Sequence, residues 1–167
     1  MSWAIGSKTI LAMLQAGDLE HVAANDEFAQ TLIDKARKHL ATAGLLQDTD
    51  LEIAFDALYT SARLSVTALL AKPGLRPTTK GGHTAPINAV RAQLGGHAKA
   101  LRSYDRLRVT RNRTDYPSPG ATLSSDDVTE GIRRAGDIID IAATVLPSCP
   151  SSSVRPYPHA QRISCTE

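Results

Sequence analysis

The sequence predicts an all-α protein, an up-and-down antiparallel bundle of four core helices plus a short N-terminal helix. Two observations predict this fold class. Aromatic residues make up 4% of the 167 residues, whereas alanine and leucine are abundant, and strands favour aromatic and β-branched residues. Apolar residues also recur at steps of three and four along several segments, which is the period of an α-helix. We expect a single hydrophobic core within residues 1–147.

The first two predicted helices lie near the N-terminus. Ser7 can cap a short helix that ends at Gly17. A long helix then begins at Asn25 or Asp26, and Gly44 is expected to end it. Its apolar stripe consists of residues spaced by four and three positions: Phe28, Leu32, Ala36, Leu40 and Ala43.

The second long helix has its own start signal. Thr49 and Glu52 have the spacing of a capping box, in which each side chain bonds the other residue's backbone N–H. Pro73 ends this helix because proline is incompatible with a helix interior. The proline and glycine content of residues 72–84 predicts a loop, and a short helix is expected over residues 84–94.

An arginine-rich helix begins near residue 97 and ends before Pro117, because the residue that precedes a proline disfavours helical geometry. Its inward residues are expected to be Ala98, Leu101 and Val109. The line from Leu101 is then continued by polar residues at helical spacing: Asp105, Arg108 and Asn112. Burying unpaired charges is costly, so this face should line a cleft, an interface or water.

The last predicted helix is capped by Ser124 with Asp127 three residues later. Its apolar stripe is regular and contains Val128, Ile132, Ala135, Ile139, Ala142 and Leu146. The remaining residues, 148–167, are rich in serine and proline and have no apolar period, which predicts a flexible tail.

Composition limits the classes of function. The formal net charge is +2, too small to predict nucleic-acid binding from the overall balance. No apolar run approaches the length of a membrane span and the N-terminus lacks the features of a signal peptide, so we expect a cytoplasmic protein without membrane contact. Cys149 and Cys165 both lie in the tail, and no histidine or cysteine has metal-ligand spacing. Neither a metal nor a cofactor is expected.

One face of the arginine-rich helix carries residue types that suit a phosphate site. Tyr104, Arg108, Arg111 and Asp115 follow one another at about one-turn steps. A guanidinium group matches phosphate oxygens, and a carboxylate can hold the arginine in place. The alternative is that Arg111 and Asp115 form an ordinary exposed helix pair, which contributes only about 0.2–0.5 kcal/mol.

Two further candidate ligand-binding residues lie outside this helix. Arg63, with Tyr59 one turn before it, could reach the arginine-rich helix, although an exposed arginine with a packed stem is the alternative. His83, at the end of the predicted loop, could donate to a ligand or could simply be solvated.

The order of helices and the segment Arg111-Asn112-x-x-Asp115-Tyr116 resemble the HEPN superfamily (higher eukaryotes and prokaryotes nucleotide-binding), over roughly residues 26–146. The stretch from Ala62 to His83 also looks like a connection between helices in bacterial members. The resemblance implies a compact helical bundle, usually dimeric, that binds RNA or a nucleotide. We expect a homodimer across the arginine-rich helix, with an intramolecular site as the alternative.

Many HEPN domains are metal-independent ribonucleases with an Arg-x4-6-His motif, and here Tyr116 occupies the position of the histidine. A phenol with a pKa near 10 is a poor base, so hydrolysis would need an atypical site. In the family's catalytic positions, Arg111 would bind phosphate, Asp115 would orient Arg111 or act as base, and Tyr116 would stack or hydrogen-bond. Asn112 and Arg108 would complete the ligand contacts.

The resemblance leaves three functions open. The leading one is an RNA- or nucleotide-binding protein, the toxin-like component of a toxin–antitoxin or defence pair with a nucleotidyltransferase. The second is a metal-independent endoribonuclease with an atypical motif. The third is a non-enzymatic module for dimerisation or protein interaction, in which the arginine-rich helix only builds an interface.

Overall fold

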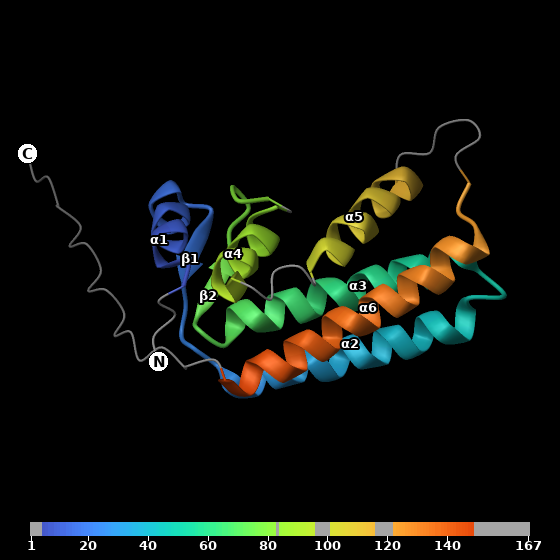
Figure 1. Ribbon diagram of the computed structural model, residues 1–167, viewed down its shortest axis with the longest axis horizontal. Helices are drawn as coiled ribbons and strands as arrows, with labels where there is room; N and C mark the ends of the chain where they lie inside the picture. The colour runs from blue at the N-terminus through green and yellow to red at the C-terminus, as the bar shows by residue number, and fades with distance from the viewer. Residues whose placement is uncertain (1–4, 83, 96–100, 116–121, 149–167) are drawn as a thin grey trace, which may run out of the picture.

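Three long helices form the core of the molecule. The computed structural model describes residues 5–82, 84–95, 101–115 and 122–148. In it, helices α2 (Asp26–Leu46), α3 (Leu51–Ala71) and α6 (Ser125–Val145) have 21 residues each. They lie side by side along the long axis of the molecule, and α3 contacts both of the others (Figure 1). A 3-10 turn, η2 (Leu146–Ser148), follows α6.

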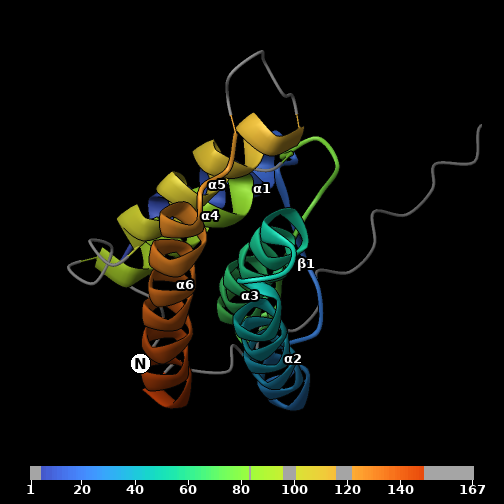
Figure 2. The ribbon, with the colours of Figure 1, turned by 90° about the vertical axis from the view of Figure 1, so that its right-hand side faces the viewer.

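Three shorter helices, α1 (Ser7–Ala16), α4 (Ala85–Leu94) and α5 (Arg102–Asp115), lie on one side of this core. Figure 2 shows them crossing over the ends of the long helices, with α5 above α3 and α6. The all-α prediction is therefore confirmed, with α2, α3, α5 and α6 as the four longer helices. Helix α1 has no buried residue and is a peripheral element, as its short amphipathic sequence indicates.

The ends of the helices agree with the sequence in most places and differ in two. Asn25 caps α2 as predicted, accepting from the Phe28 amide at 2.7 Å. Helix α3 is capped by Asp50 and not by Thr49, because the helix begins one residue later than predicted and the Asp50 carboxylate accepts from the Ile53 amide at 3.0 Å. Gly44 does not end α2, which continues for two more residues; a helical glycine is tolerated there at a modest cost.

The core lies between α2, α3 and α6, and α3 is its centre. Phe55 and Leu58 of α3 are 1% and 0% exposed, and they face Gly131 of α6. A Cβ at Gly131 would lie 2.9 Å from a Leu58 methyl group, so the absence of a side chain allows α6 to pack closely. Leu32, Ala36 and Ala43 of α2 are buried as predicted, whereas Phe28, also expected inside, is 48% exposed because Ala29 takes the inner position in the first turn.

Helix α3 is long and apolar enough to cross a membrane by length and composition, contrary to the expectation from apolar runs. A core helix of a soluble protein passes the same test. Most of its length is buried inside the bundle here, so its hydropathy is accounted for by packing.

The segment predicted as a loop over residues 72–84 contains a strand. β2 (Leu75–Pro77) pairs antiparallel with β1 (Leu19–His21), with Glu20 opposite Arg76. The Arg76 Nε donates to the Glu20 carboxylate at 2.7 Å. Gly74 precedes β2 with a φ of 78°, and a Cβ there would lie 2.4 Å from a backbone oxygen. This small sheet connects α1 to the end of α3.

Helix α5 is held by polar contacts more than by apolar ones. The Arg91 guanidinium of α4 pairs with Asp105 at its start. Within α5, Tyr104 and Leu107 are buried. Val109, predicted to face inward, is 45% exposed. The inward face of α5 carries Tyr104 and Leu107 and continues with the half-buried Arg111, and Val109 points away from this face. Ala98 lies outside the described residues.

Candidate phosphate-binding site

Helices α3 and α5 bring seven polar and aromatic residues together, which we call the α3–α5 cluster. Residues spaced by three or four positions project from each helix toward the other, because that spacing returns to the same face. Helix α3 contributes the first three members and α5 the other four: Asp56, Tyr59, Arg63, Tyr104, Arg108, Arg111 and Asp115.

Arg111 is the centre of this cluster. Its Nε donates to the Asp115 carboxylate at 2.8 Å, and its Nη1 donates to the Asp56 carboxylate of α3. Its guanidinium carbon also lies 5.7 Å from the centre of the Tyr59 ring, within the range of a cation–π contact. The side chain is only 25% exposed. Arg111 is therefore fixed in position, and Nη2 is the guanidinium nitrogen that neither carboxylate binds.

Tyr104 forms the floor of the cluster. It is 2% exposed, and its ring lies 5.9 Å from that of Tyr59. Burial raises the pKa of Tyr104 far above its usual range, and the neighbouring Tyr59 adds to this effect. The positive charges of Arg63 and Arg108 act in the opposite direction. The phenol stays neutral at physiological pH and can donate a hydrogen bond.

Arg63 and Arg108 differ from Arg111 because neither has a carboxylate partner among the residues that the structure describes. The Nε of Arg108 is buried and makes no hydrogen bond within this part of the chain. A buried donor without a partner is costly, so a ligand oxygen at this position would be stabilising. Two unpaired guanidinium groups beside a fixed third one form a suitable site for an anion.

Five of the eight sequence-predicted site residues meet in the cluster: Arg111, Asp115, Tyr104, Arg108 and Arg63. Asn112 is exposed and lies to one side of it. Tyr116 and His83 lie outside the described residues. Sequence analysis missed Asp56, whose spacing of three before Tyr59 and seven before Arg63 places it on the same face of α3.

The chemistry of the cluster is that of binding and orientation. No histidine lies in it among the described residues, and both of its carboxylates accept from Arg111. Within the described ranges, no group of three histidine, cysteine, aspartate or glutamate side chains could hold a metal ion.

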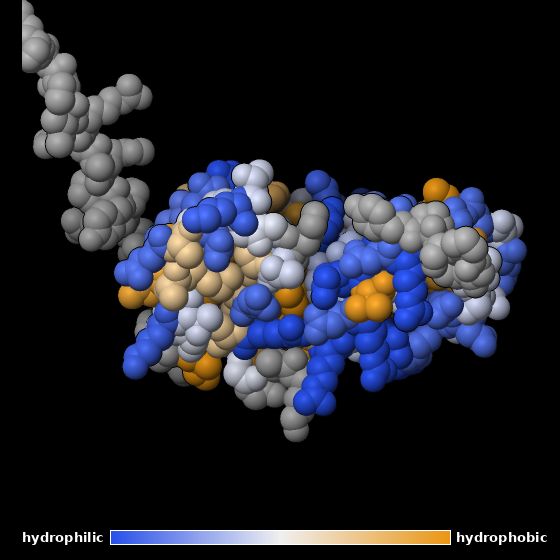
Figure 3. Space-filling view, turned by 90° about the horizontal axis from the view of Figure 1, so that it is seen from above, coloured by the Kyte–Doolittle hydropathy of each residue, from blue (hydrophilic) through white to orange (hydrophobic). Residues whose placement is uncertain are grey.

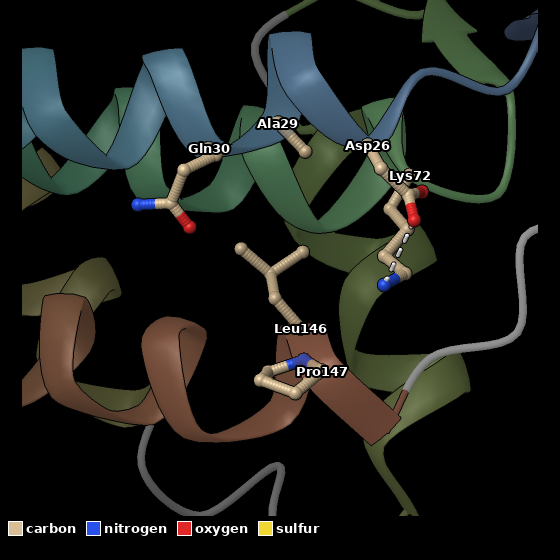
Figure 4. A pocket seen from close by; sticks show the side chains of 6 residues that line it. All are labelled: Asp26, Ala29, Gln30, Lys72, Leu146 and Pro147. Carbon is tan, nitrogen blue, oxygen red and sulfur yellow. Dashed lines mark ion pairs between the residues drawn. The ribbon is translucent and has the colours of Figure 1, made fainter.

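A separate hollow of about 170 Å³ lies at the far end of the bundle, between the start of α2 and the end of α6. Figure 4 shows its lining, in which Leu146, Pro147 and Ala29 face one another across an apolar gap. Its one cation, Lys72, pairs with Asp26 at 3.4 Å and is 12% exposed. Because the charge of Lys72 is already compensated by Asp26, this hollow is a weaker candidate for anion binding than the α3–α5 cluster.

Comparison with known proteins gave one match. The model of the HEPN domain matches residues 29–145, which include nearly all of α2 and the whole of α3, α4, α5 and α6. Domains of this family are associated with RNA- and nucleotide-related functions, often as ribonucleases or toxins. Neither the comparison with curated proteins nor that with solved structures gave a match.

Proposed function

This chain belongs to the HEPN domain family, and on that premise we propose that it binds RNA or a nucleotide through a phosphate group held at the α3–α5 cluster. One observation carries the proposal. Arg63 of α3 and Arg108 of α5 both act electrostatically on Tyr104, which lies between the two helices, and neither has a carboxylate partner among the described residues. An oxyanion at this point would accept from both.

The residues around these two arginines support an anionic ligand. Arg111 is held by Asp56 and Asp115, so its Nη2, which makes no hydrogen bond to the described residues, is oriented in advance, and little additional side-chain entropy of Arg111 is lost when a ligand binds. The partly exposed Tyr59 ring supplies a surface on which a base can stack, and the buried Tyr104 ring supports it from below. Together they fit a phosphate with an attached nucleoside.

Binding without cleavage is the form of this function that the cluster favours. Removal of a ribose 2′-OH proton needs a free base within hydrogen-bond reach. The carboxylates of Asp56 and Asp115 are both occupied by Arg111, and the cluster has no imidazole in the described part of the chain. Cleavage would therefore depend on Tyr116, and Tyr116→Phe would abolish it.

The homodimer across α5 remains a proposal, and the polar face of α5 gives it no further support. The polarity of α5 was the reason to expect a second copy, yet Asp56 and Tyr59 of the same chain already contact Arg111. These contacts support the alternative, an intramolecular site. A nucleotidyltransferase partner and a cytoplasmic location are likewise proposals, which co-purification and fractionation would test.

The experiment uses purified protein in EDTA with labelled single-stranded and structured RNA, read on a gel for both shift and cleavage. Wild type should shift RNA, and Arg63→Gln, Arg108→Gln and Arg111→Ala should each weaken binding by about five- to thirtyfold, a loss of roughly 1–2 kcal/mol per phosphate contact. Arg37→Gln, an exposed arginine of α2, is the matched control and should bind like wild type.

The salt dependence of RNA affinity distinguishes phosphate binding from the other candidate functions. Each lost phosphate contact should lower the slope of log affinity against log salt by about 0.7 for a single strand. Cleavage by wild type in EDTA would establish a nuclease in place of a binder. If micromolar wild-type protein gave no shift of RNA, the proposal would be overturned, and a non-enzymatic interaction module would be the remaining function.

A further inference from the structure

A second positively charged surface lies on the opposite side of α5. Between α5 and α6 is a hollow of about 320 Å³ lined by Asp105, Arg106, Val109, Thr110, Arg113 and Arg134. A smaller hollow of about 70 Å³ continues from it, sharing Thr110 and Arg113 and ending at Leu123 and Asp127. We call the two together the α5–α6 groove. Figure 3 shows an apolar spot on this upper side of the molecule, surrounded by hydrophilic side chains.

The charge of the groove is only partly compensated. Asp127, which lines the smaller hollow together with Arg113, feels the positive charge of Arg113, but no ion pair joins the two side chains. Arg106 and Arg113 are exposed and have no carboxylate partner in the described part of the chain. Asp105, the one acidic residue of the larger hollow, is already paired with Arg91 of α4. Arg134 pairs with Glu130 at 2.9 Å, but Glu130 also binds Arg133. Two free guanidinium groups therefore remain for an external anion.

The groove and the α3–α5 cluster face opposite ways from one helix. With 3.6 residues per turn, Arg108 and Arg111 project from one side of α5, and Arg106 and Arg113 project from the side about half a turn away. Asn112 is exposed and lies between the two sets. One ligand can reach both sites only by crossing the exposed side of α5.

We infer that the ligand of the proposed function is a single-stranded RNA that crosses α5, with phosphates bound in both the α3–α5 cluster and the α5–α6 groove. This inference rests on the proposed function. Arg106 and Arg113 hold one phosphate, the hydroxyl of Thr110 donates to it, and Val109 packs against a base or ribose. Asn112 contacts the strand where it crosses the helix.

The size and chemistry of the groove distinguish this ligand from others. A helix is only about 10–12 Å across with its side chains. A flexible single strand can bend around that diameter, whereas a duplex is far too stiff. A protein partner would need an apolar interface core within roughly 1,200–2,000 Å² of buried surface, and the larger hollow offers Val109 as its one apolar residue.

The test compares ligand lengths by fluorescence anisotropy, using a labelled trinucleotide, a single strand of about twelve nucleotides and a duplex of the same length. Wild type should bind the longer single strand at least tenfold more tightly than the trinucleotide. The double variant Arg106→Gln/Arg113→Gln should lose about tenfold for the long strand and leave the trinucleotide within twofold. Its salt slope for the long strand should fall by about 0.7, the value for the one phosphate that these two arginines hold.

Arg37→Gln/Arg133→Gln is the matched control, because it removes the same charge from exposed arginines of α2 and α6 outside the groove. It should keep wild-type affinity for both lengths. The inference is overturned if length brings no gain, if the two double variants behave alike, or if the duplex binds as tightly as the single strand. In each case trinucleotide binding would still support the proposed function, whereas loss of all RNA binding by wild type would overturn both.

Discussion

Removal of the Asp56–Arg111 contact tests whether α3 and α5 meet in solution as they do here. This contact is the only ion pair between these two helices in the described part of the chain, and every role proposed for Arg111 depends on it. The variants are Asp56→Ala, Arg111→Ala and the double variant. Together they form a double-mutant cycle that isolates the energy of the pair from the other contacts of each residue.

The exposure of the two side chains sets the expected magnitude. Arg111 is 25% exposed and Asp56 is 48% exposed, so water screens part of their attraction. Exposed pairs contribute about 0.2–1 kcal/mol, and we expect a coupling near the upper end, about 1 kcal/mol. Arg111→Ala alone should cost about 2 kcal/mol, because it also removes the Asp115 bond and the contact with the Tyr59 ring.

Urea denaturation followed by circular dichroism measures these free energies of unfolding, provided that the m-value stays constant. The control cycle uses Asp34 and Arg37, which are paired within α2 and are 56% and 53% exposed. Its coupling should be about 0.3 kcal/mol. The coupling of Asp56 with Arg111 should shrink in 1 M salt. A coupling no larger than the control would mean that the pair does not form, and the α3–α5 cluster would lose its geometry.

Three other predictions concern stability. Gly44→Ala should raise the free energy of unfolding by about 0.5–1 kcal/mol, because nothing lies within 4 Å of the new methyl group. Gly131→Val should lower it by about 1–3 kcal/mol through overpacking against α3. Urea titrations in which both variants are more stable than wild type, or both less stable, would contradict this. The pKa of Tyr104 in the folded protein lies above its unfolded value of 10.0. The contribution of the neutral phenol to the free energy of unfolding is therefore fully present below pH 10 and is lost as the pH rises above it. Absorbance titration should show one tyrosine that ionises only on unfolding, and a normal titration of all tyrosines would refute its burial. Ser124→Ala should cost about 1 kcal/mol. Because hydrogen bonds from Ser124 lower the pKa of Asp127, this variant should also lose less stability than wild type as the pH falls below about 4, and equal acid sensitivity would refute the capping box.

The sequence predicts a helix best where its apolar residues allow one alignment only. In α6, Val128, Ala135 and Ile139 are buried as predicted, because every other face of that helix is charged. In α2, Leu32, Ala36 and Ala43 are buried and Leu40 is partly buried against the core, as predicted, and only Phe28 is wrong. The aromatic ring lies outside while Ala29 takes the inner position, since close packing of α2 on α3 favours small residues.

The missed elements have no signal within a single segment. The strands β1 and β2 have three residues each, too few for an alternating pattern, and their pairing joins residues more than fifty positions apart. Asp56 was missed for the same reason. The spacing of Arg111 and Asp115 shows one carboxylate partner within α5, but the second partner comes from another helix and depends on how the helices cross.

The same residues both hold α5 and form the candidate site, so binding and stability are coupled there. Helix α5 buries only Tyr104 and Leu107 of its own residues, and its remaining contacts are ion pairs and rings. A phosphate at the cluster would meet Arg63 and Arg108 unopposed, but at Arg111 it must share the guanidinium with Asp56. The cluster therefore favours a ligand whose charge lies nearer Arg108 than Arg111, and the carboxylates keep α5 in place when no ligand is bound.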